Sequence, residues 1–415
     1  MLCYSSKKLG RCSMFYGWRL VAGLFVILAF SSGLGFYNHA VFIQALAESD
    51  RYSITAASSA VSVFFLVSGI AGLGIAPLLD RYDVRLIVVS GAIFAAIGLH
   101  WIGQITALWE LYAVYALFGV GFSASGLLPS TTLISRWFVV HRARALSISS
   151  TGLSAGGMII TPFSAYWVST FGLPQAASFQ AILYLLGVVP IAVWLLRSSP
   201  AELQLMPDGG AWQTQPSPPE GVSFDVAIRD PFFLWLNLAY SFVMLSQVGG
   251  IAHQYGLITE RVASDSVSLM MMVLPLASII GRLAGGFLLD RVPMFGFTAV
   301  MMFLQAAALA LLGLAQSAVL ICLGLALLGI TVGNLLMLQP LIIAERYGLL
   351  DYSRLFAWAN LASVAGVAAG PGLLGWLVGV HLSYHIPFLV AGGFGALAGS
   401  VFLLCLQNDT VSARG

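Results

Sequence analysis

Long apolar runs constrain the fold of this chain more than any other feature of its sequence. A helix that crosses a bilayer needs about 20 mostly apolar residues, because each residue advances the helix by about 1.5 Å. Twelve such runs lie at roughly 17–46, 54–79, 85–106, 108–134, 144–169, 174–196, 231–259, 265–289, 295–315, 317–344, 352–379 and 382–406. The sequence therefore predicts an all-α membrane protein with twelve transmembrane helices.

The composition agrees with lipid as the main solvent. Hydrophobic residues make up 59% of the chain and charged residues 8%, whereas soluble proteins carry about 25% charged residues. The sequence contains no metal-ligand cluster, no phosphate-binding glycine loop with lysine and no serine-elbow pentapeptide. We therefore expect no enzymatic activity, no cofactor, no bound metal and no nucleic-acid partner.

One long polar segment divides the twelve runs into six and six. Residues 197–229 are rich in Pro, Gly and Ser and have no helical periodicity, as is typical of a solvated linker. This pattern predicts an N-terminal six-helix bundle over 1–196, a cytoplasmic linker over 197–230 and a C-terminal six-helix bundle over 231–415.

Basic residues follow alternate loops. If the amino terminus is cytosolic, the opposite side of the membrane carries only Arg51 and Arg261 among the loop arginines. Because cytoplasmic loops are enriched in Lys and Arg, we expect a multi-pass protein of the cytoplasmic (inner) membrane with both termini in the cytosol. The cytoplasmic loops would then hold Arg81, Arg85, Arg136, Arg142, Arg144, Arg197, Arg229, Arg291, Arg346 and Arg354.

The two halves resemble each other. The second run ends in Ala76-Pro-Leu-Leu-Asp80-Arg81, and the eighth run ends in Gly286-Phe-Leu-Leu-Asp290-Arg291. A weaker match joins Gly35–His39 to Gly249–His253. Parallel six-helix repeats with a binding site between them are the plan of one large class of transporters. The repeat predicts two pseudo-symmetric six-helix bundles.

Over essentially its whole length the chain resembles the major facilitator superfamily. Asp80, Arg81 and Arg85 match part of the loop element G-x-x-x-D-R-x-G-x-R of that family, although Ala76 and Asp83 stand where it has glycines. Further segments resemble the monocarboxylate-porter-like branch, which includes oxalate/formate exchangers: Phe15–Trp18, Ser135–Phe138 and Pro200–Gly209. The resemblance implies a transporter of small organic acids, often moved with a proton or exchanged for another anion. We expect the transporter to act as a monomer.

Arg282 is the leading candidate for contact with such a solute. It lies eight residues before Asp290, about 12 Å along a helix, and therefore near the bilayer centre. The first half has Gly72 at the equivalent place, so the charge is not part of the repeat. A guanidinium fits a carboxylate with two parallel hydrogen bonds. The alternative is that Arg282 packs against helix-end carbonyls or Asp290 near the cytoplasmic end. In the resembled branch, an arginine in the eighth helix is the expected anion-binding group.

Other polar residues in the apolar runs complete the predicted substrate-binding set. His253 and His39 can relay a proton or form a hydrogen bond between helices. Tyr240, Gln247 and Gln254 recur every seven residues and share one helix face, which suits either a cavity wall or a helix contact. Asn38 adds a polar group to the first run, where packing between helices is the simpler role.

The paired charges at the cytoplasmic helix ends are predicted gating residues. Carboxylates and arginines there can lock the two halves in one state and release them in the other, and the alternative is simple membrane anchoring. The four residues are Asp80, Arg81, Asp290 and Arg291.

The sequence thus predicts a secondary transporter for a small organic anion, a mono- or dicarboxylate, that works by alternating access. Two other functions remain open: an exporter of neutral or amphipathic compounds, and a membrane receptor that binds a ligand without moving it. The solute itself is not predictable, because one fold serves many solutes.

Overall fold

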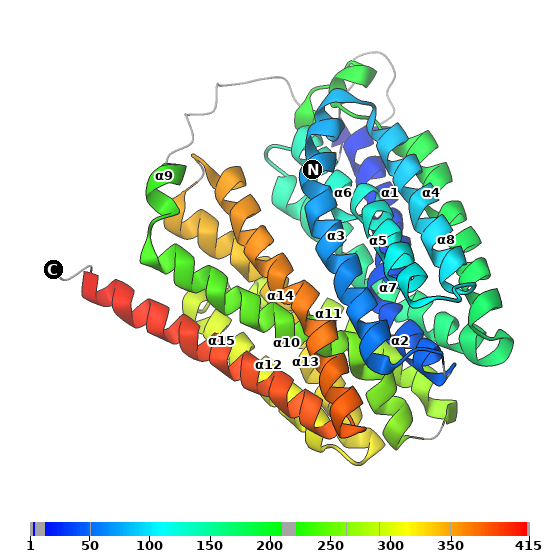
Figure 1. The fold of residues 1–415 in the computed structure, drawn as a ribbon. Helices are drawn as coiled ribbons and strands as arrows, with labels where there is room; N and C mark the ends of the chain where they lie inside the picture. The colour runs from blue at the N-terminus through cyan, green and yellow to red at the C-terminus, as the bar shows by residue number, and fades with distance from the viewer. Residues whose placement is uncertain are drawn as a thin grey trace. The chain divides into compact units, whose positions relative to one another are not determined.

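A computed structural model of the protein describes residues 3–4, 13–49, 51–209, 221–262, 264–289, 291–348 and 350–412. Within these ranges the chain is almost entirely helical (Figure 1). In lipid a helix is the natural choice, because it satisfies every backbone N–H and C=O group within one segment. Two-residue strands, β1 (Cys3–Tyr4) and β2 (Ser13–Met14), pair near the amino terminus.

Each of the twelve predicted spans corresponds to helix in the structure. The first half comprises α1 (Tyr16–Ser32), the π-helical turn η1 (Gly33–Tyr37), α2 (His39–Glu48), α3 (Ile54–Arg81), α4 (Val84–Ile102), α5 (Leu108–Ser125), α6 (Leu127–Trp137), α7 (Arg142–Phe171) and α8 (Leu173–Leu195). The second half comprises α9 (Phe224–Ala227), α10 (Pro231–Arg261), α11 (Ser264–Leu289), α12 (Met294–Leu314), α13 (Ala318–Tyr347), α14 (Tyr352–His381) and α15 (His385–Ser412).

In the described part of the chain, 11 helices are long and apolar enough to cross a membrane. The first of them, Tyr16–Glu48, combines α1, η1 and α2, and another, Leu108–Trp137, combines α5 and α6. The remaining predicted span is α7, whose sequence is rich in Ser, Thr and Gly. These small residues let α7 approach α1 closely, since a Cβ on Gly152 or Gly156 would overlap a carbonyl oxygen of α1.

The internal repeat predicted from the sequence appears in the helix packing. In the first half α4 packs on α5 and α8, and α1 packs on α7 and α8. The equivalent helices of the second half make the same pairs: α12 packs on α13 and α15, and α10 packs on α14 and α15. The fold is therefore that of an all-α membrane protein with two pseudo-symmetric sets of helices.

By its internal contacts the chain forms two compact units. Unit 1 contains Met1–Asn38 and Val67–Gln215, and unit 2 contains His39–Leu66 and Pro216–Gly415. One boundary follows directly after η1, at Asn38. Asn38 therefore belongs to unit 1 and its neighbour His39 to unit 2. The predicted bundles over 1–196 and 231–415 stay a prediction.

The core of unit 2 explains how its helices are held. Aromatic and branched side chains of α10, including Phe232, Phe233 and Leu236, pack against Met302 of α12 and Phe402 of α15. Burial of such side chains against protein, rather than lipid, is driven by dense packing. Helix ends are closed by side chains: Arg261 donates to the carbonyl oxygens of Leu312, Gly313 and Ala315 at the end of α12.

Candidate functional site

Arg282 is buried within an apolar helix. It lies on α11, inside the candidate span Ser266–Leu289, and its relative exposure is 5%. Its Nε donates to the main-chain oxygen of Gly333 on α13, at 3.3 Å. A charged side chain near the centre of a membrane helix costs at least about 2.5–3.5 kcal/mol, and such residues usually serve a function. The burial fits the predicted role of Arg282, and the contact with Gly333 fixes one edge of its guanidinium.

The close approach of α11 and α13 places Arg282 against this oxygen. A Cβ on Gly333 would overlap the main-chain oxygen of Ser278, and one on Gly329 would overlap that of Leu274. From the other helix, a Cβ on Gly281 would lie 2.6 Å from the Cα of Ile330. Glycines on both helices therefore set the backbone separation that brings the guanidinium within reach of Gly333.

His253 lies on α10 and contacts Pro371 of α14 and Tyr384, just before α15. Its relative exposure is 1%, and its Nε2 lies 3.0 Å from the main-chain oxygen of Pro371 on α14. A carbonyl oxygen only accepts hydrogen bonds, so Nε2 carries the hydrogen and Nδ1 holds a bare lone pair. Within the described residues, Nδ1 is buried and has no hydrogen-bond partner.

His39 lies among aromatic rings. Its ring contacts Phe64 and Phe65 edge-on, with ring centroids at 4.4 and 5.6 Å, and its relative exposure is 1%. Both phenylalanines belong to α3, in the segment of that helix that lies in unit 2.

Asn38 belongs to a closed polar triad in unit 1. Its Nδ2 donates to Oε1 of Gln180 at 2.6 Å, and its Oδ1 accepts from the hydroxyl of Ser164. Nε2 of Gln180 in turn donates to Ser164 at 2.8 Å. The triad joins η1 to α7 and α8, and it satisfies these buried groups within the protein.

Gln247 and Tyr240, predicted to share one polar helix face, have different surroundings. Nε2 of Gln247 donates to Oε1 of Gln305 on α12, at 2.8 Å, so it takes part in a helix–helix contact. Tyr240 is fully buried in the apolar core of unit 2. The structure thus distributes the six predicted substrate-binding residues over several packing environments, and their roles in binding stay predictions.

The predicted gating residues also have individual partners. Asp80 forms an ion pair with Arg136 at the end of α6, at 2.7 Å, and Arg136 also donates to the main-chain oxygen of Leu79. Arg81 and Arg291 are exposed. Asp290 lies outside the described residues. Their role in gating stays a prediction.

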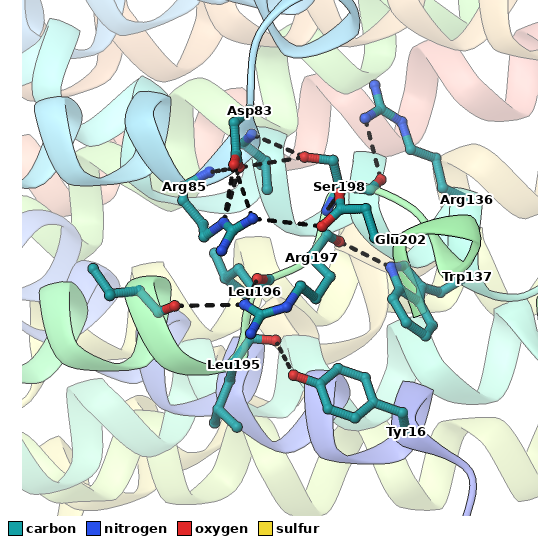
Figure 2. Close-up of polar contacts among 12 residues, drawn as sticks. Tyr16, Asp83, Arg85, Arg136, Trp137, Leu195, Leu196, Arg197, Ser198 and Glu202 are labelled. Carbon is teal, nitrogen blue, oxygen red and sulfur yellow. Dashed lines mark hydrogen bonds and ion pairs between the residues drawn. The ribbon is translucent and has the colours of Figure 1, made fainter. Parts of the chain in front are cut away.

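A second charged cluster in unit 1, around Asp83, was not expected from the sequence (Figure 2). Asp83 caps α4 by accepting from the amide of Arg85 at 2.9 Å, and it pairs with the Arg85 guanidinium at 3.0 Å. Glu202 approaches the same guanidinium at 3.5 Å and accepts from the amide of Ser198 at 2.7 Å. The signal for the cluster in the sequence is Asp83, which stands where the family element has glycine.

The pKa of Asp83 reflects this environment. Burial raises the pKa, but hydrogen bonds from the amide and side chain of Arg85 outweigh that effect, so the net pKa lies below its ordinary value. A lowered pKa means that the folded state binds the proton less well than the unfolded state. The contact of Asp83 therefore contributes stability above the ordinary pKa and loses it as the pH falls through the lower, folded-state pKa.

Asp208 closes the segment Pro200–Gly209 onto the loop before α7. Its Oδ2 accepts from the amides of Val139 and Val140 at 2.7 and 2.8 Å, and its Oδ1 accepts from the amide of His141 at 3.2 Å. The φ of Asp208 is 56°, a left-handed conformation that Asp and Asn tolerate best among residues other than glycine. The segment therefore contacts the Asp83 cluster through Glu202 and the loop before α7 through Asp208.

We expect Asp208→Asn to lower the free energy of unfolding by roughly 1–2 kcal/mol. Asparagine keeps the left-handed backbone but replaces one acceptor oxygen with a donor and removes the charge. Scanning fluorimetry of purified protein would show a fall of a few degrees in Tm. Asp225→Asn, at an exposed position on α9, is the control; equal Tm values for the two variants would contradict the prediction.

Comparison with known proteins places the chain among membrane transporters. The family model of the Major Facilitator Superfamily matches residues 25–315 and 251–414. The chain is 27% identical to the MFS transporter asaE of Aspergillus flavus over 75% of this chain and 68% of that protein. It is 25% identical to monocarboxylate transporter 13 of Rattus norvegicus over 82% of this chain and 80% of that protein.

A solved structure shares the fold at low sequence identity. A bacterial homologue of the human lysosomal transporter Spinster, in an inward-facing and occupied conformation, matches with a TM-score of 0.69 and 15% identity. The match covers 95% of this chain and 98% of that one.

Proposed function

Because this chain belongs to the Major Facilitator Superfamily, it is a multi-pass membrane transporter of a small-molecule solute, and we propose that the solute is a small organic anion. The observation that carries the proposal is the buried Arg282 guanidinium in an apolar helix. A carboxylate fits the planar donors of a guanidinium in pairs, and a charge at this depth in a membrane helix usually serves a function. A relative named monocarboxylate transporter 13 supports the same class of solute.

Arg282 holds a carboxylate in this proposal, while Gly333 keeps the guanidinium in place through its main-chain oxygen. Transport proceeds by alternating access, in which the binding site faces one side of the membrane at a time. The energy comes from a gradient, through a coupled proton or an exchanged anion. The transporter acts as a monomer.

A thermal-stability screen tests the solute class. A ligand that binds only the folded state stabilises it by about 2.7 kcal/mol at 100 times its Kd. We expect a subset of mono- and dicarboxylates to raise the Tm of the purified protein, and the same compounds to enter proteoliposomes. Expulsion of hydrophobic dyes without any carboxylate effect would indicate an exporter instead. Binding without uptake would indicate a receptor.

The topology gives a separate prediction. If both termini lie on the cytosolic side of the cytoplasmic membrane, a reporter that works only in the cytosol should be active when it is fused after Gly415. The reason is that the loops on this side hold most of the basic residues. A fusion near Ser264 should show the reverse. An inactive reporter in the Gly415 fusion would contradict the orientation.

A further inference from the structure

Unit 2 contains a cavity with two carboxylates at one end of its helices. The cavity has a volume of about 260 Å³ and lies where α2, α10 and α14 end and α15 begins. Its polar lining comprises Gln44, Glu48, Glu260, Ser383 and Tyr384. Glu48 and Glu260 are both exposed, so the cavity opens to solvent at this end.

Hydrogen bonds hold both carboxylates in place. Glu48 accepts from Nε2 of Gln44 at 3.0 Å. Glu260 accepts from the amide of Tyr384 at 2.9 Å and from the hydroxyl of Ser383 at 3.2 Å. Two fixed negative charges at one opening attract cations and repel an organic anion. The cavity therefore suits a cation better than the proposed solute.

Tyr384 forms the inner wall of this cavity. Its hydroxyl donates to Oε1 of Gln44 at 3.2 Å and fills the space over Gly256, where a Cβ would overlap it. Burial, with the charges of Glu260 and Glu48, raises the pKa of Tyr384, so the hydroxyl keeps its proton at neutral pH. The ring of Tyr384 also lies beside that of His253, with ring centroids 6.0 Å apart.

His253 lies behind Tyr384 with an unused acceptor. Nε2 is taken by the oxygen of Pro371, and Nδ1 is buried without a partner in the described residues. The hydrogen bond through Nε2 leaves this lone pair on Nδ1 able to accept a proton, which would make both ring nitrogens donors. His253 is thus a buried basic group one side chain away from an acidic opening.

Charged and titratable groups around this end of unit 2 come from every neighbouring element. Arg261 lies 3.7 Å from Glu260 but is directed to the end of α12, and Nδ1 of His385 lies 3.0 Å from the oxygen of Gly313. The side chain of Asp265, at the start of α11, is not described. The described groups are Glu48 and His39 on α2, Arg51 between α2 and α3, Tyr255, Glu260 and Arg261 on α10, His381 on α14, and Tyr384 and His385 with α15.

We propose that this cavity is a proton-entry site, through which Nδ1 of His253 is protonated when Tyr384 turns away from Gly256. A protonated Glu48 or Glu260 gives up its O–H proton through water and becomes a carboxylate, and the neutral imidazole becomes an imidazolium. No other bond changes. The inference rests on the proposed function in one respect: it names the proton as the ion that is coupled to the solute.

Hydrogen–deuterium exchange at the imidazole C2 position tests the proposal without any solute. The exchange rate of each histidine, read by mass spectrometry across a pH series, reports its pKa and its access to water. In full-length purified protein, we expect the exchange rate of His253 to change with pH around a single midpoint. In the Glu48→Gln/Glu260→Gln double variant its midpoint should fall by about 0.5–1 pH unit, because two nearby negative charges are lost.

Two variants separate access from charge. Tyr384→Ala should raise the exchange rate of His253 several-fold, because the side chain that separates it from the cavity is gone. Glu345→Gln removes an exposed carboxylate of α13 and should leave the midpoint unchanged. The other five of the six histidines report whether each variant keeps its fold.

An exchange rate of His253 that does not change with pH would overturn the proposal. So would a midpoint that the double variant leaves in place, or a rate that Tyr384→Ala leaves unchanged. Arg282→Gln should leave the midpoint of His253 unchanged. The proposals for the proton site and for the anion site can therefore be contradicted independently.

Discussion

Arg282→Gln should weaken binding of a carboxylate that stabilises the wild-type protein by roughly 30-fold to several-thousand-fold. Removing one partner of a buried, hydrogen-bonded charge pair costs about 2–5 kcal/mol, which corresponds to this range of affinities. The affinity of Arg282→Lys should lie between those of the wild type and Arg282→Gln, because lysine keeps the charge but loses the planar fork that binds two oxygens. Titration of well-folded protein with the carboxylate, followed by scanning fluorimetry or calorimetry, measures all three affinities.

A purely structural arginine gives a different pattern. Its loss would leave Gly333 without the hydrogen bond from Nε and would lower Tm and expression, while the surviving protein would bind with near-normal affinity. Comparison of affinity and Tm in the same preparations therefore separates the two roles. An affinity of Arg282→Gln within threefold of wild type would remove Arg282 from the binding site.

Gly333→Ala should destabilise the protein and disturb the Arg282 site together. The added Cβ would overlap the main-chain oxygen of Ser278, and it would lie 3.1 Å from the amide nitrogen of Arg282. Backbone cannot move aside as a flexible side chain does, so α11 and α13 must separate, at a cost of about 1–3 kcal/mol or more. We expect a lower Tm and at least a tenfold loss of carboxylate affinity, since the guanidinium moves away from the oxygen that fixes it.

Gly286→Ala is the matched control on α11. A Cβ at that position has no atom within 4 Å, and alanine is favoured over glycine within a helix by up to about 1 kcal/mol. The two substitutions make the same chemical change on facing helices. Because only the Cβ at position 333 meets backbone atoms, Gly333→Ala should lower Tm and Gly286→Ala should raise it. A Gly333→Ala protein as stable and as tight-binding as Gly286→Ala would show that the helices separate freely.

The helices were predictable from the sequence because a membrane helix is encoded by one continuous run of apolar residues. Runs of mostly apolar residues predicted all twelve helices, although α7 is not among the 11 described helices that are long and apolar enough to cross a membrane. The match between Gly286–Arg291 and Ala76–Arg81 identified the repeat. The π-helical turn η1 was not predicted, since it depends on packing: a Cβ on Gly33 would lie 2.7 Å from the main-chain oxygen of Gly156 on another helix. Such contacts arise between segments that are distant in sequence.

The surroundings of the site residues were less predictable for the same reason. The intramembrane position of Arg282 follows from its distance to Asp290, and its burial agrees with it. Its contact with Gly333 could not be predicted, because it depends on how α11 and α13 are rotated. Gln247 was equally compatible with a cavity wall and with a helix contact, and only the position of Gln305 across the interface shows the contact. Asp80 was grouped with its neighbour Arg81, whereas its ion pair is with Arg136.

The hydrogen bond between Arg282 and Gly333 has a genetic consequence. Its acceptor is a main-chain oxygen, which every amino acid carries, so a substitution at position 333 disturbs the bond only through the size of the new side chain. Selection at that position therefore acts on size alone and admits only the residue without a Cβ. A library of all single substitutions should show position 333 as intolerant of every replacement, whatever its polarity, whereas position 282 should rank its replacements by charge and shape.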